Sequence, residues 1–173
     1  MLALEKRLTK LRSDVSAPLD SFYDQQLWQG IVAFQRYAGL KRTGTYTLET
    51  QKALLVAKLP EGIHPELGFP RIEIDHRRQV QLFFNEQGLN SVIEVSTGSN
   101  RKYCKTSKKS GEQICGVVYT PRGKFRIQWR ISGWRESDLR KLYNPLYFND
   151  GFSIYGSPSV PSKNVFHGAF EYL

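Results

Sequence analysis

The sequence has few cysteines and few candidate metal ligands. Its only two cysteines, Cys104 and Cys115, lie in one short segment with no histidine beside them. Metal sites in proteins use more ligands than this, so no metal is expected, and no other motif indicates a cofactor. Two free thiols and one local disulfide both remain open. The turn-like stretch Lys108–Gly111 favours the disulfide, because it could place two β segments side by side.

Long hydrophobic runs are also missing. The longest uninterrupted apolar stretches are a few residues long, as in Ala53–Ala57, whereas a helix needs about 20 apolar residues to span a bilayer. No transmembrane segment is therefore expected. The first 14 residues place charges inside their apolar pattern and lack a small-residue cleavage site, so they are not a secretory signal. An exported form would carry its export segment outside this chain.

Acidic residues are in the minority. There are 25 Lys and Arg against 16 Asp and Glu, a net charge of +9. Such an excess attracts nucleic acids, anionic lipids or cell-wall polymers. No zinc-finger spacing or RNA-recognition signature occurs, so nucleic acid is not expected as a partner. With 40% hydrophobic and 13% aromatic residues, the chain has enough apolar material for a core, which excludes a disordered protein.

Residues 1–58 have the pattern of a compact three-helix module. An apolar residue recurs every three or four positions in the first helix, at Leu4, Leu8, Leu11 and Val15. A second helix is expected from about Asp24 to Ala38, with Gly39 as its stop. After a turn at 42–44, Thr47 is a suitable N-cap for a third helix over Leu48–Ala57.

This module resembles the peptidoglycan-binding-domain-1 family over about 55 residues. The resemblance implies a domain that attaches a partner domain to the cell wall, with peptidoglycan stem peptides and glycan as partners. It rests on Ala33–Gln35, Thr43, Thr50 and Ala53–Leu54, together with the motif residues Phe34, Gln35, Gly39, Leu40 and Gly44. By periodicity alone, Phe34, Leu40 and Leu54 are core residues.

After a breaker-rich linker at 59–70, the apolar period changes from 3.6 to 2. Val80, Leu82 and Phe84 alternate with polar residues, and a turn at 85–88 leads into Leu89–Val95, which predicts a hairpin. Lys124–Ile131 alternates in the same way. The fold class is therefore α+β, with residues 71–173 forming a mainly β domain.

This second domain resembles the catalytic domain of L,D-transpeptidases of the YkuD type, from about Ile72 to the end of the chain. The matching segments occur in order: Glu73–Asp75, Arg78–Gln79, Val95–Gly98, Thr120–Phe125, Gly133–Trp134, Leu142–Pro145, Tyr147–Phe148, Ile154–Ser157, Val160–Pro161 and His167–Gly168. The resemblance ends at Leu173, where relatives usually continue into a last helix or strand. A missing C-terminal element, a gene fragment or a frameshift would explain this end.

The family resemblance implies acyl transfer through a cysteine thioester. Its site pattern is an HG dipeptide, a loop containing VP, and then SHGC followed by an apolar residue and Arg or Asn. Here the first His falls on Tyr155, the Ser on Phe166, the nucleophile on Ala169 and the last position on Glu171, and only His167 and Gly168 are retained. A methyl group cannot attack a carbonyl, and a neutral phenol is a poor base.

The tryptophans admit two interpretations. Trp129 and Trp134 lie in alternating segments, which favours core positions over a platform for a sugar or peptide. As candidates for substrate binding the resemblance offers Trp134, Tyr147, Phe166 and Glu171.

The sequence favours an extracytoplasmic, wall-associated member of the L,D-transpeptidase family that binds peptidoglycan without catalysis. Two alternatives stay open. One is an active transpeptidase whose motif is altered or misread, and the other is a general polyanion-binding protein that uses the positive charge.

Overall fold

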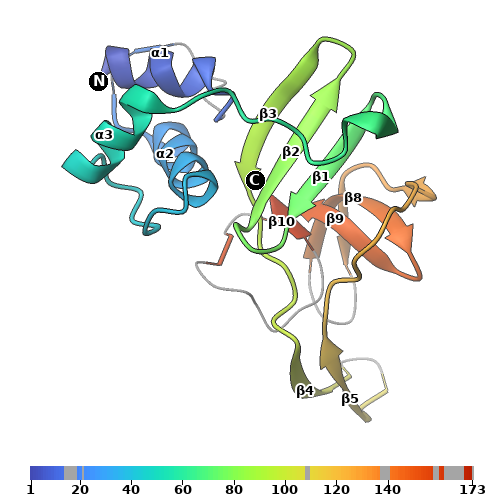
Figure 1. Ribbon diagram of the computed structural model, residues 1–173. Helices are drawn as coiled ribbons and strands as arrows, with labels where there is room; N and C mark the ends of the chain where they lie inside the picture. Colours follow the sequence, from blue (N-terminus) through green and yellow to red (C-terminus); the bar gives the residue numbers. More distant parts are fainter. Residues whose placement is uncertain are drawn as a thin grey trace. The chain divides into compact units, whose positions relative to one another are not determined.

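The structure is a computed structural model that describes residues 1–13, 19–20, 22–107, 110–136, 141–157, 160–161 and 170–172 (Figure 1). The chain divides into two packing units, Met1–Glu94 and Val95–Leu173. The first unit contains the helices together with the first three strands. Packing therefore changes after residue 94, whereas the sequence pattern changes at 59–70. The domain bounds 1–58, 59–70 and 71–173 stay a prediction.

Three helices open the first unit, as the sequence predicts: α1 (Leu2–Lys10), α2 (Gln25–Tyr37) and α3 (Leu48–Val56). Asp24 caps α2, because its carboxylate accepts a hydrogen bond from Leu27 N at 2.8 Å. Thr47 caps α3 in the same way through Thr50 N. The predicted apolar stripe is buried, and the shared core consists of Leu4, Leu8, Leu11, Leu27, Ile31, Phe34 and Leu54. Val15 lies outside the described residues.

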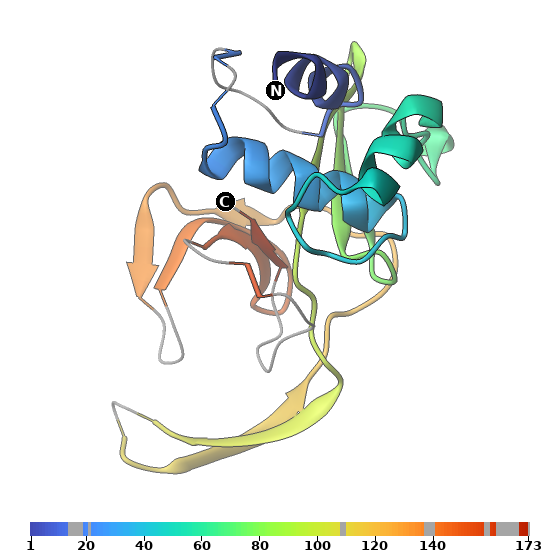
Figure 2. The same cartoon turned by 90° about the vertical axis from the view of Figure 1, so that its left-hand side faces the viewer.

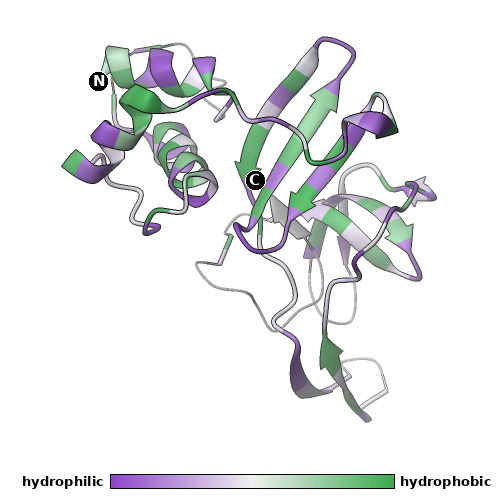
Figure 3. Cartoon of the chain, in the orientation of Figure 1, coloured by the Kyte–Doolittle hydropathy of each residue, from purple (hydrophilic) through white to green (hydrophobic). Residues whose placement is uncertain are grey.

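The same unit continues into an antiparallel sheet of order β1–β2–β3, formed by Arg71–Asp75, Val80–Asn85 and Gly88–Glu94. Val80, Leu82 and Phe84 of β2 are buried, whereas Phe83 between them is only partly buried (Figure 3 colours the strand by hydropathy). The predicted hairpin is thus confirmed. The linker contains one short 3₁₀ helix, Pro65–Leu67.

Helix α2 crosses strands β2 and β3, as Figure 2 shows. Tyr37 at the end of α2 packs against the apolar cluster of these strands. The segment after α1 also pairs with β3, because Val92 N donates a hydrogen bond to Arg12 O at 2.6 Å. Helix α2 therefore packs on the hairpin, while the helical core and the β2–β3 cluster stay two separate clusters.

The second unit contains a two-stranded ribbon and a larger five-stranded sheet. Strands β4 (Arg101–Thr106) and β5 (Gln113–Val118) form a two-stranded antiparallel ribbon. The remaining sheet has the order β10–β9–β8–β6, and β7 also pairs with β8. Its strands are β6 (Trp129–Arg130), β7 (Trp134–Glu136), β8 (Lys141–Asn149), β9 (Phe152–Gly156) and β10 (Phe170–Tyr172). Strand β10 runs parallel to β9, and the other pairs are antiparallel.

The ribbon confirms the predicted disulfide. Cys104 and Cys115 lie directly opposite each other in the β4–β5 register, and their sulfur atoms are bonded at 2.03 Å.

The alternating segment 124–131 departs from the prediction. Only Trp129 and Arg130 pair, with β8, and the apolar residues Phe125, Ile127 and Trp129 are between 41% and 47% exposed. Trp134 is 59% exposed. The predicted core positions of Trp129 and Trp134 are therefore wrong. An alternating pattern leads to a buried face only where another layer of the protein covers that face. Among the described residues, no layer covers the apolar face of segment 124–131.

No helix in the described part of the chain is long and apolar enough to cross a membrane.

Candidate functional site

The motif of the helical module builds one buried hydrogen-bond centre around Gln35. This side chain is 1% exposed. Its carbonyl oxygen accepts from the backbone N of Thr43 and Gly44, both at 2.9 Å, and its amide donates to Thr43 Oγ1, Thr45 O and Thr50 Oγ1. Residues that are far apart in the motif therefore meet in space. The Gln35 amide thus hydrogen-bonds backbone groups of the loop after α2, and its own buried polar atoms are satisfied in return, as is usual for buried polar groups.

Gly44 lies in this loop because no larger residue fits there. Its φ is +69°, and a Cβ atom on it would lie 1.9 Å from Trp28 Nε1. The Gly44 carbonyl accepts a hydrogen bond from the Tyr23 hydroxyl. Burial raises the pKa of Tyr23 above its ordinary value of 10.0, because the phenolate would be partly desolvated.

The other motif residues of the module are also structural. Phe34 is 2% exposed within the helical core, and Leu40 packs against that core. Gly39 follows α2 with φ +71°, as expected for a helix stop. The motif residues thus account for the loop after α2 and for part of the helical core.

Two motifs of the second unit meet at the base of the β4–β5 ribbon. Gly98 N donates to Thr120 Oγ1 at 2.8 Å. A Cβ atom on Gly98 would lie 2.7 Å from the backbone of Tyr119, so only glycine allows this approach. Ser96 and Thr97 beside it are buried.

A second pair of motifs meets at the turn between β6 and β7. Gly133 N donates to Asn144 Oδ1 at 2.7 Å, and Asn144 N donates back to Gly133 O at 2.9 Å. Strand β7 then places Trp134 opposite Tyr143, with their ring centroids 5.0 Å apart. Both rings are exposed, at 59% and 42%.

Aromatic rings continue along β8 beside this pair. Trp129 stacks on Tyr147 with ring centroids 3.6 Å apart and planes 9° apart. The Arg135 guanidinium lies 5.5 Å and 5.6 Å from the centroids of these two rings. Tyr147 is only 5% exposed, because Trp129 covers it, whereas Trp129 itself is 43% exposed. The accessible rings of these two pairs are therefore Trp129, Trp134 and Tyr143.

The sequence pattern marked Trp129, Trp134 and Tyr147 as candidates but did not indicate their contacts with Tyr143 and Arg135. Pairing of β6 and β7 with the same strand, β8, joins them. The motif segments Gly133–Trp134 and Leu142–Pro145 were the available signal, because both resemble family segments.

The structure describes only some of the residues that stand at the family's catalytic positions. Tyr155 is fully buried in β9. The parallel register of β9 and β10 places residue 171 opposite residue 155. Phe166, His167, Gly168 and Ala169 lie outside the described residues. Both cysteines of the chain are joined in the disulfide, so neither provides a free thiol.

Two comparisons with known proteins found matches. Residues 1–54 match the family model described as "Putative peptidoglycan binding domain". The chain is similar to the crystal structure of an L,D-transpeptidase from Xylanimonas cellulosilytica, with a TM-score of 0.83 and 28% identity, over 99% of this chain and 80% of that one. A crystal structure of an L,D-transpeptidase from Stackebrandtia nassauensis matches with a TM-score of 0.39 and 13% identity, over 99% of this chain and 89% of that one. No curated protein matches the sequence.

The first of these structures and the family match define the class: three helices followed by a mainly β domain with the L,D-transpeptidase fold. The chain accordingly carries a peptidoglycan-binding domain at its N-terminus, and its fold is similar to that of an L,D-transpeptidase.

Proposed function

We propose that this protein binds peptidoglycan outside the cytoplasm and does not catalyse cross-linking. The observation that carries the proposal is the combination of a peptidoglycan-binding domain at residues 1–54 with a transpeptidase fold in which alanine stands at the nucleophile position, Ala169. Thioester chemistry needs a thiolate, and both cysteines of the chain are bonded to each other.

The positions around Ala169 support the same conclusion. Tyr155 replaces the first histidine of the family pattern and is buried, and a phenol stays neutral near pH 7. Glu171 replaces Arg or Asn, and a carboxylate close to a thiol would raise the pKa of that thiol. These differences at several positions indicate that more than one catalytic group is lost.

The exposed ring pair of Trp134 and Tyr143 on β7 and β8 is the candidate contact for wall material in the second unit. Flat exposed rings offer apolar faces, and Trp indole N–H groups add donors, a combination suited to sugars and peptides. In this proposal Trp134 contacts the ligand directly. Tyr147 supports Trp129 from below, and Phe166 and Glu171 stay proposed neighbours of the site.

The test is sedimentation of the purified chain with insoluble peptidoglycan, at low salt and at 0.5 M salt. We expect binding at both, because ring stacking does not depend on counterions. Trp134→Ala should weaken it several-fold, while Trp134→Phe, which keeps an aromatic face, should retain most of it. Binding that disappears at 0.5 M salt would instead favour a general polyanion-binding protein.

Catalysis is tested by mass spectrometry after incubation with a carbapenem and with disaccharide-tetrapeptide. We expect no adduct and no cross-linked product from the natural chain. The variant Tyr155→His, Phe166→Ser, Ala169→Cys, Glu171→Arg tests whether the scaffold accepts the family's groups, and an adduct on it would show that only the chemistry is lost. An adduct on the natural chain would establish the alternative, an active transpeptidase.

A further inference from the structure

The first unit contains a second candidate site, at the loop that follows α2 in the helical module. In the described part of this module three aromatic side chains are exposed, Phe22 at 71%, Tyr23 at 51% and Tyr46 at 37%. Single exposed rings scattered over a surface need no explanation, but these three belong to two segments that meet. The Tyr23 hydroxyl donates a hydrogen bond to the Gly44 carbonyl and so joins the two segments.

Trp28 adds another ring at this meeting point. A Cβ atom on Gly44 would lie 1.9 Å from Trp28 Nε1, so the indole lies directly against the Gly44 backbone. The Trp28 side chain is half-buried, and its N–H has no acceptor among the residues that the structure describes. Tyr46 follows Gly44 by two residues, which keeps their Cα atoms within about 7 Å of each other. We call Tyr23, Trp28 and Tyr46 the aromatic site of the module.

The backbone of the aromatic site is fixed by hydrogen bonds within the module. Gln35 accepts from Gly44 N at 2.9 Å and donates to Thr45 O at 3.0 Å. Thr47 N also donates to Thr45 O at 3.0 Å, and the Thr47 side chain caps α3. Tyr46 therefore lies between two anchored positions. A backbone that is ordered before binding reduces the entropy cost of holding a ligand.

The polar groups beside these rings can bind hydroxyl groups. Asp20 and Asp24 flank the segment that carries Tyr23, and each uses its Oδ1 atom to accept a backbone hydrogen bond. The other oxygen of each carboxylate has no partner in the described part of the chain. The Tyr46 hydroxyl also has no hydrogen bond to any described residue. The site therefore offers two carboxylate acceptors and a phenol hydroxyl to an outside ligand.

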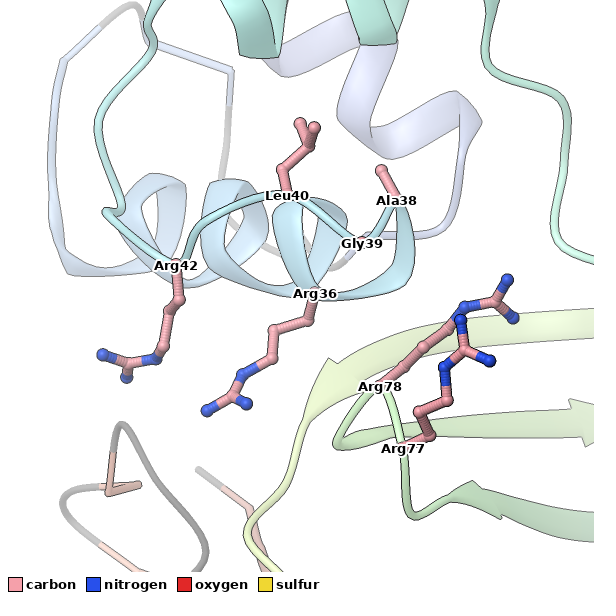
Figure 4. Close-up of a pocket in the computed structure, with 7 residues that line it drawn as sticks. All are labelled: Arg36, Ala38, Gly39, Leu40, Arg42, Arg77 and Arg78. Carbon is pink, nitrogen blue, oxygen red and sulfur yellow. The ribbon is translucent and has the colours of Figure 1, made fainter.

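The charges near the aromatic site disfavour an anionic ligand. Arg42, in the loop after α2 (Figure 4), donates to both carboxylate oxygens of Glu94, so this cation is already paired. Lys41 is exposed, but the carboxylates of Asp20 and Asp24 outnumber it. These aspartates repel a ligand carboxylate or phosphate. A neutral ligand with many hydroxyl groups therefore fits the site better than an anionic one.

We propose that the aromatic site binds the neutral sugar chain of peptidoglycan. The C–H faces of amino sugars stack on Tyr and Trp rings, and their hydroxyls donate to carboxylate oxygens. A stem peptide carries carboxylates of its own, which the two aspartates repel. The inference rests on the proposed function and assigns the part of the wall polymer that the helical module contacts. The contact proposed at Trp134 belongs to the second unit and is tested separately.

The test uses the hexamer of N-acetylglucosamine, a soluble and neutral sugar chain without peptide. Calorimetry measures its binding to the full chain carrying Trp134→Ala, so that the contact proposed in the second unit does not contribute. We expect the sugar to bind and a free stem tetrapeptide not to bind. In NMR spectra the indole N–H signal of Trp28 should shift on addition of the sugar, because this group lies against Gly44 within the site.

Variants in the same background then locate the binding. Tyr46→Ala should weaken sugar binding about 3-fold or more, as expected for the loss of one aromatic contact, whereas Tyr46→Phe keeps the ring and should retain most of the binding. Leu55→Ala is the matched control, because Leu55 is 74% exposed on α3 and its loss removes apolar surface elsewhere on the module. It should bind the sugar normally. Melting temperatures of all three variants show whether each is folded.

Four results would overturn the inference: no sugar binding, binding of the stem tetrapeptide in place of the sugar, equal weakening in Tyr46→Ala and Leu55→Ala, or a Trp28 indole signal that does not respond to the sugar. The Trp28 signal is measured without any change in the module, so it decides the matter even if Tyr46→Ala does not fold. The proposed function fails on a different result, a natural chain that does not sediment with peptidoglycan. The two proposals can therefore fail separately.

Discussion

At the scale of single residues, the helical module depends on groups whose importance is invisible in composition. Gln35 is a polar residue on the buried side of a helix, and its amide meets four backbone and hydroxyl partners of the loop after α2 and the Thr50 hydroxyl of α3. A sequence pattern can mark Gln35 as part of a motif. It cannot show that the motif residues bind one another, because that requires the loop to fold back on α2.

Gly44 and Gly39 form a matched pair for testing this loop. Both have φ near +70°, but only at Gly44 would a Cβ atom collide with a neighbour, the Trp28 ring. Gly39→Ala should lower the free energy of unfolding by about 1 kcal/mol, the cost of a left-handed alanine. Gly44→Ala should lower it by about 3 kcal/mol, because the overlap adds to the same cost.

Urea unfolding monitored by circular dichroism measures both values. Equal losses in the two variants would contradict the close approach of Trp28 to Gly44.

Tyr23 gives the module a dependence on alkaline pH. Burial raises the pKa of Tyr23, so above pH 10 the unfolded chain loses this proton before the folded chain does. The free energy of unfolding is therefore unaffected by this group below pH 10 and falls as pH rises beyond it. Tyr23→Phe lacks both the proton and the hydrogen bond to Gly44 O.

We expect the natural protein to be more stable than Tyr23→Phe at pH 8, with the difference shrinking at pH 11. Urea unfolding at the two pH values measures the difference, and a constant gap would disagree with the raised pKa.

At the scale of elements, neighbouring strands decide which residues are exposed. The alternating pattern correctly predicts β2, because β1 and β3 flank it and α2 covers it. The same pattern at 124–131 gives two paired residues, Trp129 and Arg130, and an exposed aromatic surface. Alternation indicates the period of a strand, while burial depends on a second layer that the pattern does not include.

We expect the β4–β5 ribbon to depend on its disulfide for order. Cys104 and Cys115 close a loop of about 12 residues, which contributes about 3 kcal/mol in the chain-entropy model. Replacing both by serine should increase hydrogen exchange at the amides of residues 101–106 and 113–118. Exchange in β1–β3 should not change, because those strands belong to the other unit. Slow exchange in the ribbon of the Cys104→Ser/Cys115→Ser variant would contradict this role.

At the scale of the whole molecule, the module and the first hairpin pack as one unit. Removing residues 1–58 would uncover the apolar face of β2 and β3, so loss of wall binding in that deletion would not identify the ligand surface. Point variants such as Trp134→Ala avoid this problem.

The packing predicts that residues 1–94 fold by themselves. We expect this fragment to unfold in a single cooperative transition, because it contains both the helical core and the β2–β3 cluster. A fragment of residues 1–58 should be less stable, since it loses the Arg36 and Arg42 pairs with Glu94 and the packing of Tyr37. Thermal unfolding followed by circular dichroism compares them. Equal melting temperatures would show that the hairpin contributes nothing to the module.

The sequence by itself determined the local features of this protein. Caps such as Asp24 and Thr47, the helix stop at Gly39, and the alternation in β2 act over a few residues, so the local pattern contains their physical cause. The ordered family segments likewise predicted the transpeptidase fold, and two cysteines around a turn predicted the disulfide. Tertiary structure alone decided the exposure of Trp129 and Trp134 and the pairing of Arg36 and Arg42 with Glu94, more than 50 positions away. Burial and ion pairing depend on which distant segments pack together, and no local pattern specifies that.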